Sequence, residues 1–265
     1  MNSIASLREI ESKYILENYI EMWDSLAVTG KVSCFHFKNY VIVNSNVDDP
    51  GFNILIPKDK ISKTDLDFIK KQYKEKRNNF TIMSPMNYLE EVKEQLAPFF
   101  IQEMYGLVRE TYGNDIFNNE LSKELSFVET FENSFITRNW KNILKTSFSM
   151  TNSASQQFVN ILSSYNKIVD NFNHTVTYIN GDPASICSIL YSKNSIHAGL
   201  YNGASLSKHP MHKPFVSIIN KHINDAFNNG YKWVISQSTP IAANALKKYL
   251  GFTTLDIYSY YKVLI

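Results

Sequence analysis

The order of apolar patterns in the second half of the chain constrains the fold more than any other feature. Three β-branched or aromatic runs come first, with the turn Asn180-Gly181 between the first two, so an antiparallel meander is predicted. Because each element has an apolar face to bury, the whole order predicts an α/β fold with a mixed sheet. The predicted elements are strands 175–179, 184–191 and 196–200, a helix from Pro214 to a stop at Gly230, strand 232–236, a helix from Pro240 to Gly251, and strand 252–264.

A polar, turn-rich segment over 110–120 separates this half from the first. Junctions between domains have this composition, so we predict two domains, 1–120 and 121–265. The second domain is expected to open with strand 127–131 and two helices, capped by Thr137 and Ser153. The first domain is predicted to contain helix 3–23, strands 32–37, 40–44 and 52–56, a helix capped by Thr64, strand 80–83, a helix begun by Pro85, and strand 101–108.

Composition places the chain among ordinary globular proteins. Its 265 residues are 44% hydrophobic and 20% charged, which suits two packed domains. The opening residues carry acids and lack the apolar core of a signal peptide, and no apolar run approaches the length of about 18 residues that a membrane span needs. Cys34 and Cys187 lie far apart in apolar runs and are expected to be buried thiols in a reducing compartment. A cytoplasmic protein with no membrane partner is therefore expected.

Charge is divided unevenly between the halves. Residues 1–120 have 14 Lys and Arg against 18 Asp and Glu, whereas residues 121–265 have 13 against 7. A basic second half suits a small anionic ligand, although a solvated Lys-rich exterior would give the same count. Arg, whose planar fork reads bases and phosphates, occurs at only four positions, so nucleic acid is not the expected partner.

The end of the chain carries a recognisable pattern. Strand 233–236 and a short polar segment that includes Ser238 lead into a helix that reads Ala243-Asn-Ala-Leu-Lys-Lys-Tyr-Leu-Gly-Phe252. This resembles the GCN5-related N-acetyltransferase (GNAT) family, and the similarity in element order spans about residues 125 to 265. Residues 1–120 resemble a degenerate copy of the same fold. The resemblance therefore implies two tandem GNAT-like domains, with an unrelated α+β cap domain as the alternative for 1–120.

The resemblance implies acetyl-coenzyme A (acetyl-CoA) as co-substrate, held where the fourth and fifth strands of the sheet splay apart. Family phosphate loops are rich in glycine, but the segment 205–215 has no glycine and two prolines, which donate no amide. Basic side chains could supply charge in their place, whereas His209 and His212 without neighbouring acids do not indicate a metal site. The cofactor-binding residues implied in this way are Leu200, Tyr201, Asn202, Gly203, Lys208, His209, His212, Lys213, Ser238 and Asn244.

Acyl transfer to an amine also needs a proton donor for the leaving thiolate and a base for the ammonium. In the family a tyrosine often donates that proton, four residues before the glycine of Gly-Phe. The matching residue here is Lys247, with Tyr249 and Tyr258 as nearby substitutes, although all three also suit surface or packing roles. For the base, His197 is the near-neutral titrating group of its strand. Glu129 and Glu132, near the start of the second domain, are the alternatives.

Two hypotheses of different classes follow. The first is an N-acetyltransferase that moves an acetyl group directly from acetyl-CoA to a primary amine. Its site would lie in the second half, its first half would close one side of the acceptor cleft, and its acceptor would be a small molecule or a protein. The second is a catalytically inactive GNAT-like fold that acts as a binding or regulatory module, because the phosphate loop has lost its glycines. Binding of the coenzyme distinguishes the two hypotheses.

Overall fold

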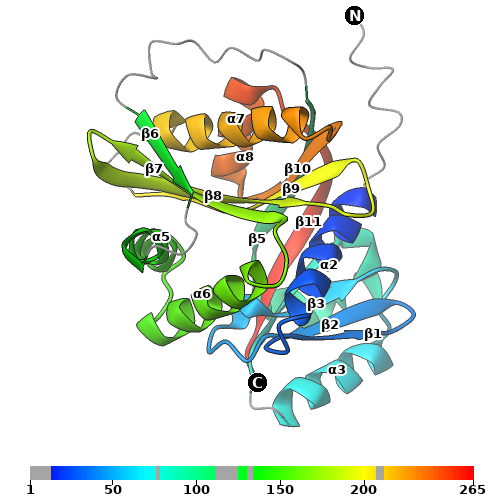
Figure 1. The fold of residues 1–265 in the computed structure, drawn as a ribbon. Helices are drawn as coiled ribbons and strands as arrows, with labels where there is room; N and C mark the ends of the chain where they lie inside the picture. The colour runs from blue at the N-terminus through cyan, green and yellow to red at the C-terminus, as the bar shows by residue number, and fades with distance from the viewer. Residues whose placement is uncertain (1–12, 76–77, 112–124, 130–133, 207–211) are drawn as a thin grey trace, which may run out of the picture. The chain divides into compact units, whose positions relative to one another are not determined.

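The computed structural model describes residues 13–75, 78–111, 125–129, 134–206 and 212–265. It divides into two compact units, and each unit draws on distant parts of the sequence (Figure 1). The first unit combines residues 1–107, 237–240 and 254–265. The second combines residues 108–236 and 241–253. The sequence prediction placed the last strand in the second domain, whereas the structure groups it with the first unit.

The second unit has the strand order β10-β9-β8-β7-β6. Strands β6 to β9 pair antiparallel in sequence order, which confirms the predicted meander, and β10 is parallel to β9. Figure 1 shows α7 on one side of this meander and α5 on the other. The elements are β6 (Leu125–Glu129), α5 (Ser134–Ser147), α6 (Asn152–Asn166), β7 (Phe172–Ile179), β8 (Asp182–Tyr191), β9 (His197–Ser205), α7 (His212–Asn228), β10 (Trp233–Ser238) and α8 (Pro240–Leu250).

The tight turn between β7 and β8 brings Ile179 opposite Asp182. Asn180 and Gly181 both have positive φ, at 51° and 85°. A two-residue hairpin turn of this kind matches the right-handed twist of the strands it joins, and Asn and Gly adopt it with the least strain. The predicted turn is therefore confirmed, with Asp182 already part of β8.

The first unit has the strand order β1-β2-β3-β4-β11-β5. Strand β11 pairs antiparallel with β4 over six residues, from Tyr258 opposite Pro85 to Val263 opposite Phe80. Tyr261 and Val263 of β11 belong to the same buried cluster as the core residues of α3. The elements are α2 (Lys13–Ala27), β1 (Ser33–His36), β2 (Tyr40–Asn44), η2 (Pro50–Phe52), β3 (Asn53–Pro57), α3 (Lys63–Glu75), β4 (Phe80–Pro85), β5 (Phe100–Glu110) and β11 (Thr253–Val263).

The helix predicted to begin at Pro85 is wrong. Pro85 ends β4, and short helical turns follow it instead of one helix. Leu89 and Val92 have ψ values near zero, which interrupt a regular helix, while both side chains remain buried three residues apart. The turns are η3 (Met86–Tyr88), η4 (Glu90–Val92), α4 (Lys93–Leu96) and η5 (Ala97–Phe99).

Three helix starts also differ from prediction. Ser62, not Thr64, caps α3, since its Oγ accepts from the Asp65 amide at 3.1 Å. Thr151, not Ser153, caps α6, with its Oγ1 accepting from the Ala154 amide at 3.0 Å. Thr137 lies inside α5, which begins at Ser134. In each helix the predicted cap lay too late in the sequence, by two residues in α3 and α6, because Ser and Thr residues cluster at these starts and each fits the pattern.

Two expectations about the chain as a whole have mixed outcomes. Both cysteines are free, but only Cys187 is buried, whereas Cys34 is partly exposed. Among the described residues, no helix is both long and apolar enough to cross a bilayer. Part of the helix predicted over 3–23 lies outside the described residues, and α2 covers the rest of it up to Ala27.

Candidate active site

Strands β9 and β10 pair for only part of their length. Their parallel register runs from His197 opposite Trp233 to Leu200 opposite Ser236. Strand β9 then continues to Ser205 without further residues of β10 in its register. The sequence resemblance implied a splay between the fourth and fifth strands, and the register of β9 with β10 ends at Leu200.

A bulge in β9 follows the last paired residue. Tyr201 lies opposite Ser188 and Ala204 lies opposite Ile186, so two residues of β9 face Cys187 alone. The extra residue bends the strand and changes the direction of its peptide groups. Asn202, one of the two, has a φ of 55°, which a side chain of this type tolerates better than most.

Gly203 lets α7 approach the bulge closely. A Cβ atom at this position would come within 3.0 Å of the Phe215 ring on α7. Gly203 is nevertheless exposed to solvent on the rest of its surface. The bulge therefore combines tight packing against a helix with an accessible main chain.

Two polar side chains that sequence reasoning missed lie beside the bulge. The amide Nδ2 of Asn202 donates to Ser188 Oγ at 3.5 Å, and the same oxygen lies 2.7 Å from His174 Nδ1. Burial lowers the pKa of His174 to about 3, with the nearby His222 as a second cause. Both Phe172 and His174 precede the predicted strand 175–179, whereas β7 (Phe172–Ile179) includes them, so the prediction began the strand three residues too late to place His174 on it.

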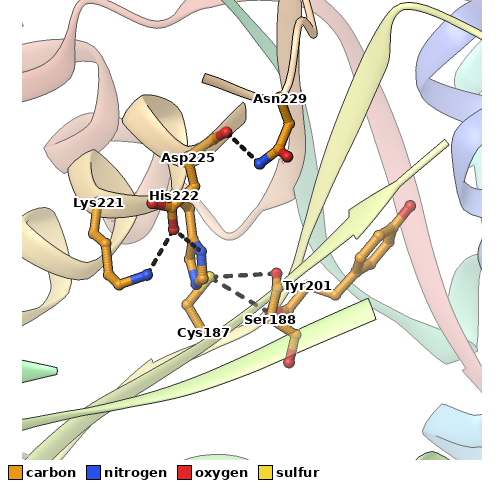
Figure 2. A network of polar contacts seen from close by, with 7 residues as sticks. All are labelled: Cys187, Ser188, Tyr201, Lys221, His222, Asp225 and Asn229. Carbon is orange, nitrogen blue, oxygen red and sulfur yellow. Dashed lines mark hydrogen bonds and ion pairs between the residues drawn. The ribbon is translucent and has the colours of Figure 1, made fainter. Parts of the chain in front are cut away.

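A second polar group lies on α7, as Figure 2 shows. Asp225 Oδ2 accepts from Lys221 Nζ at 2.6 Å and lies 3.7 Å from His222 Nδ1. The His222 ring is completely buried and points toward Cys187, the β8 residue opposite the bulge. Burial lowers the pKa of His222, and contacts with Asp225 and the main chain of Cys187 oppose that shift. The sulfur of Cys187 lies 3.7 Å from the carbonyl oxygen of Tyr201, and burial raises the pKa of this thiol.

The basic residues predicted to bind phosphate are only partly described. Lys208 and His209 lie outside the described residues. His212 is the first residue of α7, and the Lys213 side chain is exposed in the same turn. Pro214 follows them and donates no amide, so this helix start has fewer main-chain donors than an ordinary one.

The candidates on and after β10 lie in different surroundings. Asn244, Lys247 and Tyr249 are exposed on α8, with Lys248 Nζ 5.0 Å from the centre of the Tyr249 ring. Ser238 is buried at the end of β10 and groups with the first unit.

Tyr258 is completely buried in the first unit. A Cβ atom at Gly106 would come within 2.7 Å of its ring, which shows how closely the ring packs on β5. Burial raises the pKa of Tyr258 well above its ordinary value, and Asp256 adds to the shift.

The candidate bases lie at strand ends. His197 is buried at the first residue of β9, and burial lowers its pKa. Glu129 is the last residue of β6 and lies opposite Thr175 in β7, while Glu132 lies outside the described residues. The described part of the chain contains no cluster of three or more side chains suited to holding a metal ion. Of the predicted binding residues, Leu200 to Gly203 thus lie where β9 leaves the register of β10 and forms its bulge. The roles of all the predicted site residues stay predictions.

No family model and no curated protein matches this sequence, whereas solved structures match its fold. A GCN5-related N-acetyltransferase from Kribbella flavida superposes with a TM-score of 0.62 at 8% identity, over 92% of this chain and 94% of that one. One from Sphaerobacter thermophilus gives 0.56 at 10% identity, over 85% and 80%. The fold is that of the GCN5-related N-acetyltransferases. A tandem GNAT protein from the clavulanic acid biosynthesis pathway covers 96% of both chains at 7% identity, with a TM-score of 0.51, so the similarity extends over both units.

Proposed function

We propose that this protein is an acyl-CoA-dependent N-acyltransferase that moves an acetyl group from acetyl-CoA to a primary amine, with its site in the second unit. The main supporting observation is the end of β9. This strand leaves its parallel partner after Leu200, carries a bulge at Asn202 and Gly203, and exposes main chain there. A main chain in this position can pair with the amide groups of a pantetheine arm.

The described residues fit an acyl donor of this shape. The arm would lie along the main chain of Tyr201 to Gly203, where Gly203 is exposed. Its anionic end would lie toward the start of α7, where Lys213 is exposed. A lysine and the positive end of the helix dipole favour a phosphate, although Pro214 removes one amide from the cradle. When bound, acetyl-CoA supplies the activated acyl group.

Main-chain N–H groups at the bulge would polarise the thioester carbonyl, because donors fixed before the reaction stabilise charge as it develops. We assign the proton donor to α8, where Lys247 and Tyr249 are exposed. Tyr258 is left out, since its hydroxyl is buried in the first unit and its raised pKa disfavours the phenolate that proton exchange would form. His197 and Glu129 are the candidates for the base, and the amine acceptor would be a small molecule or a protein.

Ligand binding tests this proposal directly. Ligand at about 100 times its dissociation constant stabilises a protein by roughly 2.7 kcal/mol, or a few degrees for domains of this size. We expect acetyl-CoA to raise the unfolding midpoint. With a panel of primary amines as acceptors, we expect the protein to convert acetyl-CoA to free coenzyme A. Gly203→Val should weaken binding at least tenfold, because its Cβ would meet the Phe215 ring at 3.0 Å and its methyl groups would displace the bulge from α7.

Gly51→Val is the matched control. A Cβ at Gly51 also meets a close neighbour, Asp49 Oδ1 at 3.1 Å, but it lies in the first unit. This variant should bind acetyl-CoA as the wild type does. If millimolar acetyl-CoA does not shift the wild-type midpoint, the enzyme proposal is wrong, and the glycine-free segment before α7 then favours a binding module.

A further inference from the structure

The bulge of β9 is flanked by a buried histidine on each face of the sheet. His174 of β7 is 4% exposed and His222 of α7 is 0% exposed. They lie on opposite faces, because His174 pairs with Ser188 whereas His222 points toward the preceding residue, Cys187. Side chains of successive strand residues point to opposite faces. Cys187 faces the two bulged residues, and Ser188 pairs with Tyr201 beside them.

On the first face, two hydrogen bonds link His174 to the bulge through Ser188. The Nδ2 of Asn202 can only donate, so Ser188 Oγ accepts from it at 3.5 Å. The same hydroxyl oxygen lies 2.7 Å from His174 Nδ1, and because a hydroxyl can both donate and accept, it links the two side chains with either His174 tautomer. Trp140 and Phe172 hold the imidazole in place, with ring centroids 5.5 and 4.7 Å away. A neutral His174 therefore fixes Ser188, and Ser188 fixes the Asn202 side chain.

On the second face, α7 orients His222. Lys221 Nζ holds Asp225 Oδ2 at 2.6 Å, and the same carboxylate lies 3.7 Å from His222 Nδ1. Asn229 Nδ2 donates to the Asp225 carbonyl oxygen at 2.8 Å, at the end of the helix. The opposite side of the ring faces Cys187 (Figure 2). The ring is thus held by α7 on one side and faces Cys187, the residue opposite the bulge, on the other.

We propose that His174 and His222 hold the Asn202–Gly203 bulge from the two faces of the sheet and are positioning residues for acyl transfer. The second half of this statement rests on the proposed function. A bulge is sensitive to such support, because a slip of one residue in register would exchange the faces of Asn202 and Gly203. The main-chain donors at Tyr201 to Gly203 would then point away from the thioester. Neither imidazole touches substrate in this arrangement.

Hydrogen exchange of the ligand-free protein tests the clamp without any activity. We expect His174→Leu and His222→Leu to speed exchange in the peptide that covers 201–204 at least tenfold, relative to peptides from α6. His174→Asn should stay near the wild type, since an amide can replace Nδ1 as the partner of Ser188 Oγ. His222→Gln should likewise keep exchange low, because it retains a polar group near Cys187.

Kinetics test the positioning role. With the best amine of the panel, both Leu variants should lose at least tenfold in kcat, while the KM for acetyl-CoA changes less than threefold. Asn at 174 and Gln at 222 should restore most of kcat. Ile218→Ala is the matched control, because Ile218 is buried on α7 one turn before His222. It should lower the unfolding midpoint, but it should raise the exchange rate at 201–204 no more than in peptides from the rest of the chain.

Each outcome decides a separate point. If the Leu variants raise exchange uniformly, as Ile218→Ala does, the two histidines do not hold the bulge and the clamp is wrong. If exchange rises locally but kcat is unchanged, they hold the bulge and do not position the reaction. If wild-type protein neither binds acetyl-CoA nor transfers acetyl groups, the catalytic half fails with the proposed function, and exchange still decides the structural half.

Discussion

The two units differ at the first strand of their parallel pair, which is β3 in the first unit and β9 in the second. In the first unit, β2 and β3 keep an unbroken register from Tyr40 opposite Pro57 to Asn44 opposite Asn53. The amides of Lys58 and Asp59, just beyond β3, both donate to the Asn39 carbonyl oxygen, at 2.7 and 3.1 Å. In the second unit, the register of β8 and β9 is interrupted by the bulge opposite Cys187. The main chain at the end of β3 is therefore used internally, whereas β9 presents an accessible bulge.

The helix starts differ in the same direction. Asp65 accepts from both the amide and the hydroxyl of Ser62, at 3.1 and 2.6 Å, so a carboxylate already occupies the positive end of α3. The amide of Ile61 donates to the Tyr88 carbonyl oxygen at 2.8 Å. The start of α7 has an exposed lysine in place of an internal carboxylate. We propose that the first unit is a degenerate GNAT-like domain that keeps the scaffold and has lost the anion site.

The largest expected effect concerns β11, which follows the second unit in sequence but pairs with β4 of the first. We expect residues 1–120 alone not to fold, because β4 would lose its six-residue pairing with β11 and the core would lose Tyr261 and Val263. An unpaired strand edge and lost apolar burial each oppose folding. Circular dichroism and proton NMR dispersion of the purified fragment measure this. A self-contained repeat would instead give a cooperative unfolding transition.

A linked fragment is the control for this test. Residues 1–107 followed by a flexible linker and residues 253–265 restore the partner of β4. This version should recover a cooperative transition that the 1–120 fragment lacks. If both fragments fold equally well, β11 does not complete the first unit, and the boundary predicted at residue 120 describes the folding units correctly.

Most elements follow from local pattern, whereas strand partners and the site do not. The runs that became β7, β8 and β10 were predictable, since alternation and turn residues act within a few residues. The pairing of β11 with β4 was not, because sequence order does not state which distant strand completes a sheet. The bulge depends on a single extra residue, and its support by His174 and His222 depends on four elements meeting, β7, β8, β9 and α7. In the sequence, the only sign of those contacts is a histidine among apolar residues.

Acid should lower the free energy of unfolding of the second unit more than that of the first, by a smaller but measurable amount. Burial lowers the pKa of His174 from its ordinary 6.5 to about 3, and it lowers the pKa of His222 as well. Because the unfolded chain takes up protons that the folded second unit refuses, its free energy of unfolding is greatest above about pH 6.5 and falls as pH drops toward 3. In the first unit, the described histidine is His36, which is exposed and pairs with Asp24 at 2.8 Å. The second unit should therefore lose more stability.

Tryptophan fluorescence can follow each unit between pH 7.5 and 5, above the range in which carboxylates titrate. Trp23→Phe leaves Trp140 and Trp233 as probes of the second unit, and the double change at those two positions leaves Trp23 to report the first. We expect the urea midpoint of the second unit to fall more steeply with acid. His174→Asn should flatten that slope. Equal slopes for both probes, unchanged by this substitution, would contradict the assignment.

The smallest expected effect compares one lysine in each unit. Lys213 is exposed in the first turn of α7, and Lys63 is exposed at the first residue of α3. A single exposed charge contributes up to about 1 kcal/mol, so Lys213→Ala should raise the dissociation constant of acetyl-CoA by about twofold to fivefold. Lys63→Ala should leave it unchanged, because Asp65 already neutralises the start of α3. Calorimetric titration at low and high salt measures both, since salt should remove the difference between wild type and Lys213→Ala. An equal loss in the two variants would mean that both lysines attract the ligand through net charge alone, and the distinction between a closed and an open helix start would fail.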